Sequence, residues 1–518
     1  MWPLPLFMLT TVTAIVGTSK ILFIPDPCVS HMNLFTILGE ALKDDGHEVW
    51  MISNDKNNKT ISDRGIVPLT YAWKRENDLF TELDELSAGG VDLEQAWALL
   101  ETDPWKMATS RICEAIMQNS VIMSTIRRQK FDLVVVDGAD ELVCHLMIPY
   151  IFDIPFVPVM CFQASTWGHG TTGMPSIEPE IFTAFSNRMD FWQRLENAKA
   201  WFKKYYNAYY QMHAFHMDKY CPKNKPKISM KKLVGMAEMY FLNYEVLCLD
   251  YPRVSGPNLQ FLGATTGKPV KPLPRDLEAY VAGAEHGVVL ISFGSKQASH
   301  QVWNVIGEKM FDALGRLPQR AIVQYRLDGM TGTIPDNVKL LQWLPQNDIL
   351  GHRRLKLFIT HGGNNGQNEA VYHGVPMLVI PLFIDQYYNA MRVEQHTYGK
   401  QVSDVTTITS DELYQMMKEL IINKTYARNI KKCSEIIRSM PPATEKFVFW
   451  VNHVLRFGGA HLRPPSLDMP LYQVLMLDVL AYYIIFYLVV FHVMMFSLYF
   501  LVKYTWTYFK LCRKEKNA

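Results

Sequence analysis

The 518-residue sequence has almost no net charge, because 52 Lys and Arg residues face 50 Asp and Glu residues and leave a formal value of +2. It also contains no basic patch interleaved with aromatic residues. Proteins that bind nucleic acids need such a basic face to neutralise phosphates. We therefore expect no nucleic-acid partner. Long internal repeats and low-complexity segments are absent as well, so the chain is expected to be mostly globular.

One long segment, Val479–Val502, carries no formal charge at all, and His492 is its one titratable group apart from tyrosines. About two dozen apolar residues are enough to span a bilayer as a helix. The tail after this segment, residues 503–518, is basic, with one acid, Glu515, against Lys503, Lys510, Arg513, Lys514 and Lys516. By the positive-inside rule the tail is expected in the cytosol and nearly all of the preceding chain in the lumen.

Residues 1–19 (MWPLPLFMLTTVTAIVGTS) are apolar, too short to span comfortably, and end in small residues. This pattern predicts a secretory signal peptide cut near Gly17–Ser19. It lacks a basic leading region, and the alternative is a buried first strand that runs into Ile21–Pro25. At the other end, Lys514 and Lys516 stand fifth and third from the C-terminus. They resemble the dilysine retrieval signal of endoplasmic-reticulum (ER) membrane proteins, so we expect the ER membrane as a partner.

The sequence lacks the cysteine spacings of metal sites, since its 8 cysteines are scattered without C-x-x-C pairs. We expect no metal site and few disulfides. Cys512 lies in the predicted cytosolic tail, which leaves an odd number on the lumenal side, so at least one lumenal thiol is free or pairs with another chain. Two glycosylation sequons begin at Asn58 and Asn423, and both are usable with that topology.

The body of the chain alternates short apolar runs with helical patterns, which is typical of wound α/β folds. A gap rich in proline and glycine, Pro257–Pro274, separates two such regions. Thr409 to Glu412 predict a helix-initiating capping box. The aromatic-rich residues 180–220 are expected to be mostly core, although they could also line a lipophilic pocket. Strands are expected at residues 20–27, 49–53, 132–137, 155–159, 288–294, 320–325, 339–343, 355–360 and 377–381.

The most informative stretch is residues 343–389, WLPQNDILGHRRLKLFITHGGNNGQNEAVYHGVPMLVIPLFIDQYYN. An apolar run, Leu355–Ile359, leads to His361-Gly362-Gly363, then to a helix-like stretch and a second apolar run. A strand, a glycine turn and a helix N-terminus place backbone N–H groups against a phosphate. The stretch closely resembles the signature of the membrane-bound UDP-glycosyltransferases, the family that includes the UDP-glucuronosyltransferases.

That resemblance covers almost all of the chain after residue 19 and implies the GT-B fold, in which two Rossmann-like domains face each other. It assigns the acceptor to the N-terminal half and the UDP-sugar to the C-terminal half. The domains are then residues 20–262 for the acceptor and 287–470 for the donor, with a linker at 263–286 and a C-terminal transmembrane helix at 479–502. The fold class is α/β, and the UDP-sugar serves as a co-substrate, with no cofactor expected.

Two residues at the ends of predicted strands offer acid–base chemistry. His31 follows the first strand and Asp137 ends the strand DLVVVD, so in a parallel sheet both emerge at the same edge. An imidazole can take a proton from an acceptor near neutral pH, and a carboxylate can fix its tautomer. A solvated histidine and a helix cap are the ordinary alternatives. The pair matches the catalytic His–Asp dyad of the family, and Asp140 replaces Asp137 if the register slips.

For the donor, the resemblance implies roles residue by residue. Trp343 would stack on uracil, with Gln346 as its hydrogen-bonding neighbour, and Glu369 would hold the ribose. His361 and the turn Gly363, Asn365 and Gly366 would cradle the diphosphate, with Ser295 on its phosphate side. Asp385 and Gln386 would grip the sugar hydroxyls, next to Asn389. Each of these residues also has an ordinary structural interpretation, since a tryptophan is usually part of the core and an Asp or Gln after a strand usually belongs to a turn.

One departure concerns the sugar. Family members that use UDP-glucuronate carry an arginine before the Tyr-Pro-Arg segment, but no arginine occurs from Met230 to Tyr251 here. An uncharged hexose such as glucose is therefore favoured, and His361 or Arg253 is the candidate cation if glucuronate is used. We expect an inverting transferase of small lipophilic acceptors. A transferase for one membrane lipid (a ceramide or sterol) and a non-catalytic partner subunit are the alternatives, and the sequence leaves homo- and hetero-oligomers open.

Overall fold

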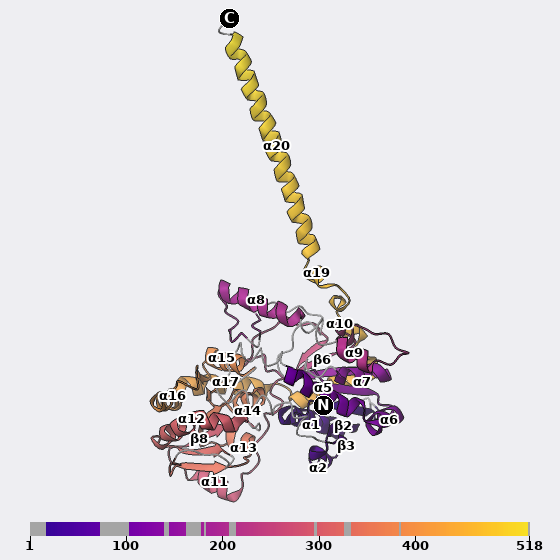
Figure 1. Cartoon of the computed structure of the whole chain (residues 1–518). Helices are drawn as coiled ribbons and strands as arrows, with labels where there is room; N and C mark the ends of the chain where they lie inside the picture. Colours follow the sequence, from indigo (N-terminus) through magenta and orange to yellow (C-terminus); the bar gives the residue numbers. More distant parts are fainter. Residues whose placement is uncertain are drawn as a thin grey trace, which may run out of the picture. The chain divides into compact units, whose positions relative to one another are not determined.

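The computed structural model describes residues 17–72, 103–138, 144–161, 178–180, 183–206, 214–294, 298–325, 333–382 and 385–515. The chain divides into two units, Met1–Pro464 and Pro465–Ala518. The first unit contains two parallel sheets, one in each half (Figure 1). Most of the expected signal peptide lies outside the described residues.

The sheet of the N-terminal half has seven strands in the order β3-β2-β1-β4-β5-β6-β7. All neighbouring strands pair in parallel. The bounds are β1 Lys20–Ile24, β2 Glu48–Asn54, β3 Val67–Tyr71, β4 Leu133–Asp137, β5 Phe156–Met160, β6 Tyr240–Leu242 and β7 Leu259–Phe261. The helices around this sheet are α1 Val29–Asp44, η1 Asp55–Asn57, α2 Asn58–Ser62, α5 Asp103–Met117, α6 Ser120–Gln129, α7 Cys144–Phe152, α8 Phe191–Tyr206, α9 Ala214–Tyr220 and α10 Met230–Val234.

Strand β1 shows why the strands of this sheet appear in the sequence as continuous apolar runs. Ile21 and Phe23 point into one core cluster with α1, whereas Leu22 and Ile24 point into another with α5, α6 and α7. Successive side chains of a strand alternate between faces, and both faces are covered here. The carboxyl ends of β1 and β4 therefore lie side by side, with Ile24 paired to Val136.

The C-terminal half has six parallel strands in the order β10-β9-β8-β11-β12-β13. Their bounds are β8 Val288–Ser292, β9 Arg320–Gln324, β10 Val338–Leu341, β11 Leu355–Thr360, β12 Met377–Val379 and β13 Gly399–Gln401. The helices are α11 Arg275–Ala282, α12 Ala298–Gly315, α13 Gln346–Leu350, α14 Asn364–His373, α15 Gln386–Gln395, α16 Ser410–Ile422 and α17 Lys424–Ser439. The predicted capping box is confirmed, since Thr409 and Glu412 bond each other's backbone at the start of α16.

Helix α18, Ala443–Phe457, returns to the first half, followed by the short turn η5, Ala460–Leu462. Helix α18 lies in the range expected for the donor domain, yet its Phe447 packs against the first sheet. The Phe447 ring centroid lies 6.5 Å from that of Phe23 and 4.9 Å from that of Phe241. Conversely α11, in the range expected for the linker, packs through Leu277 into the second core. The domain boundaries otherwise stay a prediction.

Two disulfides brace the first unit, Cys113–Cys144 and Cys248–Cys433. The second joins the segment after β6 to α17 in the other half. Within the described residues, Cys28, Cys161 and Cys221 form no disulfide. The expectation of few disulfides therefore agrees with the described structure.

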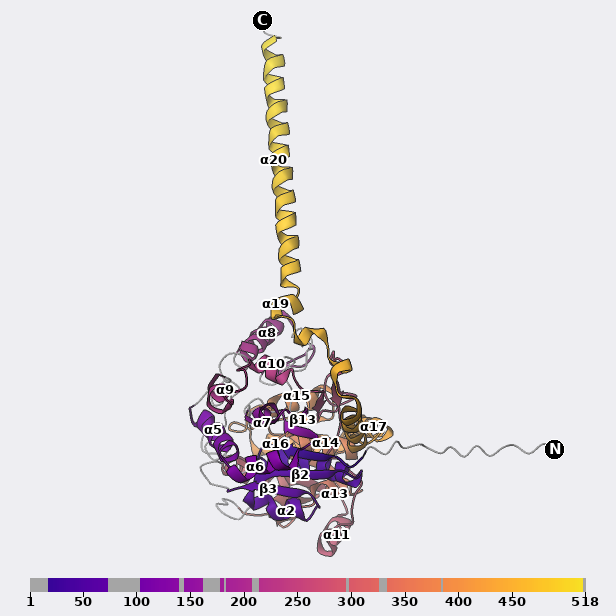
Figure 2. The same ribbon diagram turned by 90° about the vertical axis from the view of Figure 1, so that its right-hand side faces the viewer.

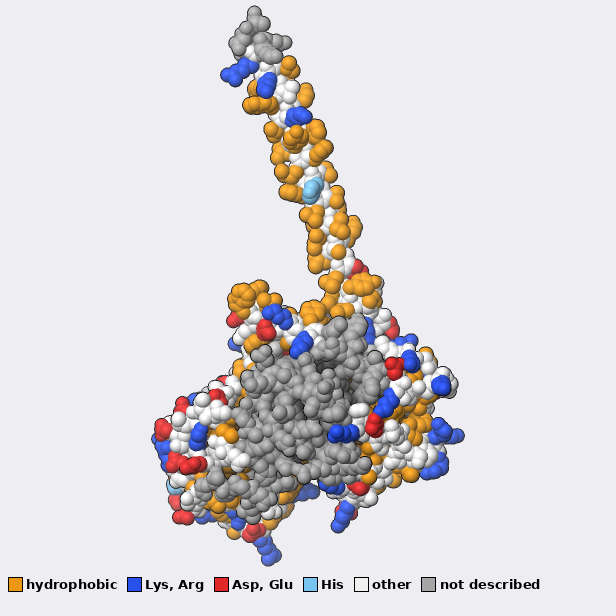
Figure 3. All heavy atoms as spheres, in the orientation of Figure 1, with side chains coloured by type: hydrophobic (Ala, Val, Ile, Leu, Met, Phe, Trp, Pro, Cys, Tyr) orange, Lys and Arg blue, Asp and Glu red, His pale blue; other side chains and the backbone are white. Residues whose placement is uncertain are grey.

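The second unit contains η6 Pro465–Leu467, α19 Leu471–Val474 and the long helix α20, Leu477–Glu515. Within α20, the span Leu477–Leu511 contains an 18-residue window with a mean hydropathy of 2.3 and no buried residue, so this helix is long and apolar enough to cross a membrane. Hydrophobic side chains cover its visible face, and Lys and Arg gather near its C-terminal end (Figure 3). The helix continues beyond residue 502 into the predicted tail.

Aromatic residues of α8 correct one expectation. Trp192 and Phe202 are exposed to 72% and 51%, whereas Trp201 is buried. The stretch was expected to be mostly core, but the described part of α8 uses one face for packing and leaves aromatic side chains on the other, which a count of aromatics cannot distinguish. The side chains of Tyr205, Tyr206, Tyr209 and Tyr210 lie outside the described residues. The helix lies at the rim of the body in both views (Figures 1 and 2).

Candidate active site

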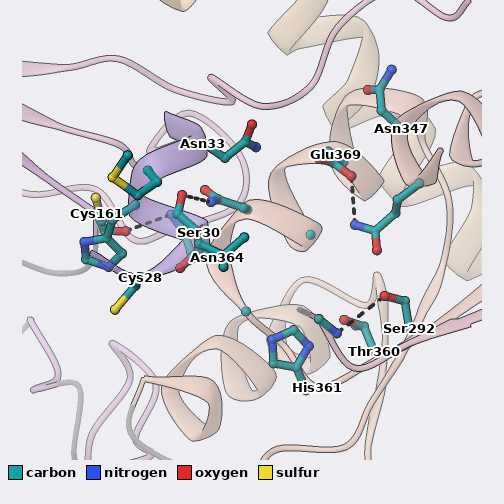
Figure 4. Close-up of a pocket in the computed structure, with 18 of the residues that line it drawn as sticks. Cys28, Ser30, Asn33, Cys161, Ser292, Asn347, Thr360, His361, Asn364 and Glu369 are labelled. Atoms are coloured by element: carbon teal, nitrogen blue, oxygen red, sulfur yellow. Dashed lines mark hydrogen bonds between the residues drawn. The ribbon is translucent and has the colours of Figure 1, made fainter. Parts of the chain in front are cut away.

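A cleft of about 710 Å³ is lined by residues of both halves. Figure 4 shows Ser30, Asn33 and Cys161 of the N-terminal half on one side and His361, Ser292, Thr360 and Glu369 of the C-terminal half on the other. The lining includes the carboxyl ends of strands in both sheets, which is where open α/β sheets bind ligands. Of the described residues predicted to bind or react, His31, Trp343, Gln346, His361, Gly363, Asn365, Gly366, Glu369, Asp385 and Gln386 line this cleft, whereas Asp137, Asn389 and the alternative Arg253 do not.

His31 and Asp137 form a hydrogen-bonded pair at the wall of the cleft. His31 Nδ1 lies 2.7 Å from Asp137 Oδ2, and the aspartate is fully buried. The backbone N–H of Asp26 donates to the same carboxylate oxygen at 3.1 Å. His31 was expected in a loop, but it lies in the first turn of α1, which fixes its backbone more firmly. Because Asp137 holds Nδ1, the ring nitrogen left for proton transfer is Nε2.

The two charges of this pair shift the pKa values of His31 and Asp137 in opposite directions. Burial alone would lower the pKa of His31, but the negative charge of Asp137 raises it well above its usual range. Burial alone would raise the pKa of Asp137, but His31 and the Asp26 N–H hold it below its usual range. These interactions therefore favour an imidazolium–carboxylate pair.

Cys161 is a third group at the pair, and sequence reasoning missed it. Its thiol lies 3.9 Å from Asp137 Oδ2. Burial raises the pKa of Cys161 to about 12, so it stays a neutral thiol rather than a nucleophile. His31, Asp137 and Cys161 place three potential metal-ligand atoms within 4.8 Å of one another. The short His31–Asp137 hydrogen bond accounts for that closeness without an ion.

Two asparagines at the N-terminus of α14 connect the halves. Asn364 Nδ2 donates to the backbone oxygens of Asn243 at 2.7 Å and Cys161 at 3.3 Å. Asn365 Nδ2 donates to Ser30 O at 3.1 Å and its Oδ1 accepts from Asn243 Nδ2 at 3.1 Å. The backbone amide of Asn365 is predicted in the phosphate cradle, and its side chain holds α14 against the residue before His31.

The glycine turn after β11 shapes the expected phosphate site. Gly362 has a φ of +88°, and a Cβ there would come within 2.7 Å of Val379. A Cβ on Gly294 or Gly363 would come within 2.9 or 2.5 Å of the His361 ring. Glycines are therefore required for the imidazole to fit between β8 and the start of α14. Gly363 caps α14, whose N-terminus faces the cleft with unpaired N–H groups.

Glu369, Gln346 and Trp343 lie together at the other end of the donor wall. Gln346 Nε2 donates to Glu369 Oε2 at 2.8 Å (Figure 4). Burial raises the pKa of Glu369 to about 7. Trp343 is 73% exposed, so it is not a core residue and offers an open face to a ring. Lys268, which the sequence analysis did not identify, also lines this part of the cleft.

Asp385 and Gln386 begin α15 beside the glycine turn. Asp385 Oδ2 accepts from Asn389 Nδ2 at 2.7 Å, which orients the carboxylate. Gln386 Oε1 accepts from the Leu382 N–H at 2.8 Å. Both residues line the cleft, and Asn389 supports Asp385 rather than lining it.

Two predicted residues, Ser295 and the alternative Asp140, lie outside the described residues. Arg253, an alternative partner for a sugar carboxylate, does not line the cleft. Its guanidinium is 5% exposed and bonds Tyr388 OH at 2.7 Å and Asp250 Oδ2 at 3.3 Å. It is committed to a buried network.

Comparisons with known proteins agree with this geometry. The sequence model of the family described as UDP-glucoronosyl and UDP-glucosyl transferase matches residues 19–516. Human "2-hydroxyacylsphingosine 1-beta-galactosyltransferase" is 30% identical over 91% of this chain and 86% of its own length. Human "UDP-glucuronosyltransferase 2B17" is 30% identical over 89% of each chain.

The fold has counterparts among solved structures. The glycosyltransferase of kitacinnamycin matches with a TM-score of 0.59 and 17% identity over 84% of this chain and 98% of its own. The calicheamicin glycosyltransferase CalG4 gives the same TM-score at 16% identity, covering 85% of this chain and 99% of its own. At such identities the likeness shows the fold, GT-B, and nothing finer.

Proposed function

Because the chain belongs to the family of UDP-glucuronosyl and UDP-glucosyl transferases, we propose that it transfers a hexose, with glucose favoured, from a UDP-sugar to small lipophilic acceptors with inversion at C1. Membership makes it a UDP-glycosyltransferase, and the sugar, the acceptor and the residue roles are the proposed part. The observation that carries these roles is the His31–Asp137 pair, 2.7 Å apart, on a cleft whose facing wall holds the α14 N-terminus.

In the proposed reaction the His31 ring is in its neutral form, and its Nε2 accepts the acceptor's hydroxyl proton while the oxygen attacks C1 of the sugar. The new glycosidic C–O bond forms as the bond between C1 and the diphosphate oxygen breaks, and UDP leaves with the electron pair. Asp137 stabilises the imidazolium that results. The N–H groups at the start of α14 stabilise the charge that develops on the diphosphate.

The donor contacts follow from the wall of the C-terminal half. We assign uracil to the exposed face of Trp343 and the ribose hydroxyls to Glu369. The turn at His361 and Gly363 binds the diphosphate, and Asp385 and Gln386 bind the sugar hydroxyls, because a carboxylate accepts well from two vicinal hydroxyls.

The cations at the cleft support a neutral sugar. Among the described lining residues the permanent cations are Arg64, which is bonded to Glu40 at 2.8 Å, and Lys268. Lys268 interacts with Glu369. Burial, the larger effect, raises the pKa of the Glu369 carboxyl, and the charge of Lys268 lowers it. With these two cations already engaged elsewhere, a glucuronate carboxylate would have to be buried beside the Asp385 carboxylate, which is costly. His361 is the remaining candidate partner if glucuronate is used.

The name of one relative favours the second candidate acceptor, a membrane lipid of the ceramide type, since that protein is a galactosyltransferase of 2-hydroxyacylsphingosine. The long apolar α20 would place the enzyme on such a substrate's membrane. We also propose the ER membrane, with both sheets lumenal and the chain crossing once. Asn58 and Asn423 are exposed, as glycosylation requires.

The test is a matrix of UDP-glucose, UDP-galactose and UDP-glucuronate against phenol, sterol and ceramide acceptors, read by mass spectrometry with the full-length enzyme in microsomes. We expect most product from UDP-glucose with a small phenol, whereas product confined to a sterol would favour the alternative of a single membrane lipid. Asp385→Asn is the matched variant for the sugar site, because asparagine keeps the shape of the Asp385 side chain and removes its charge. Faster turnover of UDP-glucuronate than of UDP-glucose would reject the assignment of the sugar, and product confined to ceramide would establish the second candidate.

A further inference from the structure

A buried arginine stands directly behind the wall of the cleft where α14 begins. Arg392 of α15 has no solvent exposure. Its Nη2 donates to Asn364 Oδ1 at 2.7 Å and its Nε donates to Gln367 Oε1 at 2.9 Å. Asn364 itself lines the cleft (Figure 4). One side chain therefore separates the guanidinium from the expected diphosphate.

Among the described residues, none provides an ionic partner for the charge of this guanidinium. No carboxylate oxygen of the described residues forms an ion pair with Arg392, and its Nη1 makes no hydrogen bond. Its other close neighbours are the rings of Tyr244 and Tyr388, 5.4 and 6.0 Å from the guanidinium carbon. Asp250, an acid of the same buried layer, is already bonded to Arg253 and Tyr388.

A buried charge is costly unless an opposite charge accompanies it. The second arginine of the layer shows the ordinary solution, because Arg253 is paired with Asp250 and lies 3.7 Å from Glu178. For Arg392 the missing charge is best supplied from the cleft. A diphosphate at the α14 N-terminus would bring negative charge to the far side of Asn364, in a low-dielectric region where the attraction is weakly screened.

We propose that Arg392 is a positioning residue whose buried charge is completed by the donor's diphosphate, acting through Asn364 and the first turn of α14. It never touches the ligand. Its two hydrogen bonds fix the helix start whose N–H groups meet the phosphates, and its charge adds to the positive end of the helix dipole. The inference rests on the proposed placement of the diphosphate at this turn.

The experiment compares uridine and UDP binding to the full-length enzyme in detergent by calorimetry. Three variants separate charge from packing: Arg392→Lys keeps the charge, Arg392→Gln keeps only amide donors, and Arg392→Met keeps neither. We expect the Gln and Met variants to lose at least about tenfold in UDP affinity, the order of one weakly screened charge pair, with uridine affinity unchanged. The Lys variant should keep the wild-type ratio of the two affinities to within about threefold.

Other outcomes overturn the proposal. A ratio unchanged in Arg392→Gln would show that the charge does not reach the diphosphate. An equal loss in Arg392→Lys would assign the effect to the hydrogen bonds alone, as would a parallel loss of uridine affinity. If neither neutral variant folds while the Lys variant does, Arg392 belongs to the folded core and the proposal fails.

Two further variants keep this result distinct from the donor placement. Arg253→Gln removes a buried arginine that is already paired, so it should lower the melting temperature and leave the ratio unchanged. Trp343→Ala tests the placement itself, because it should weaken uridine and UDP together. Unchanged binding in Trp343→Ala would reject the proposed donor site, whatever the Arg392 variants show.

Discussion

Glu369 makes the sharpest prediction, because its buried carboxyl has a pKa of about 7 instead of about 4.5. If the ionised carboxylate holds the ribose hydroxyls, uridine binds only the deprotonated form. At pH 6 that form is about one part in eleven, so affinity should be roughly tenfold weaker than at pH 8. Above pH 8 the affinity should level off. Glu369→Gln has no titrating group at this position, so its weaker affinity should not change with pH.

Calorimetry with uridine measures this directly, because uridine carries no phosphate to titrate. Runs at pH 6 in two buffers with different ionisation enthalpies should also show release of about 0.9 proton per uridine bound, since about ten-elevenths of the carboxyls start protonated. A flat affinity between pH 6 and 8 in the wild type would refute the role of Glu369. So would the same slope in Glu369→Gln.

The same carboxyl affects folding with a definite sign. Its pKa is higher in the folded enzyme than in the unfolded chain, so the folded state binds the proton more tightly. The free energy of unfolding should therefore fall as pH rises from about 4.5 to about 7, by about 3 kcal/mol for the 2.5-unit difference. Glu369→Gln should melt higher than the wild type at pH 8 and lose that advantage near pH 4.5.

The remaining predictions concern the base, the sugar and the topology. His31→Ala should lose about 10²–10⁴-fold in turnover with UDP affinity nearly unchanged, and full activity would reject the assignment. Since Asp137 raises the pKa of His31, wild-type kcat/KM should rise with pH up to that pKa. Asp137→Asn should lower the rate and shift this rising part of the pH profile to lower pH. An unshifted profile would show that Asp137 does not act on the proton of His31. Asp385→Ala should weaken UDP-glucose turnover far more than UDP binding, and equal losses in both would place the sugar elsewhere. In sealed microsomes, protease should remove only the tail after Val502, and digestion of the preceding chain without detergent would show the opposite topology. The double variant Lys514→Ser, Lys516→Ser should let the protein leave the ER.

Most strands were predictable from the sequence, and four were missed. The runs that became β1, β4, β8 and β11 are mainly apolar because helices cover both faces of each sheet. Strands β6, β7 and β13 have three residues each, which is few for a pattern; β12 is equally short but lies inside the longer apolar run 377–381. Strand β3, with the sequence VPLTY, has five residues but contains a proline and a threonine. Their places are set by neighbouring strands, information that exists only after the sheet forms.

The site shows the same limit. His31, Asp137 and the glycine turn could be predicted because each follows an apolar strand. Arg392 was missed, although a signal exists: it stands four residues after Tyr388 and three after Asn389, on the buried stripe of its helix. An arginine on such a stripe is unusual enough to notice. The partners Asn364 and Cys161 come from distant segments and could not be paired without the fold.

The return of α18 to the first sheet has a consequence for synthesis. Phe447 completes the packing around Phe23 and Phe241, so the N-terminal half cannot bury that surface when its own last strand, β7, has been made. Nearly two hundred further residues must be synthesised first, as the span from Phe261 to Phe447 requires. During that interval the half-made enzyme displays an apolar patch that chaperones recognise. A chain truncated before α18 should therefore aggregate or remain chaperone-bound, even though every residue of its first sheet is present.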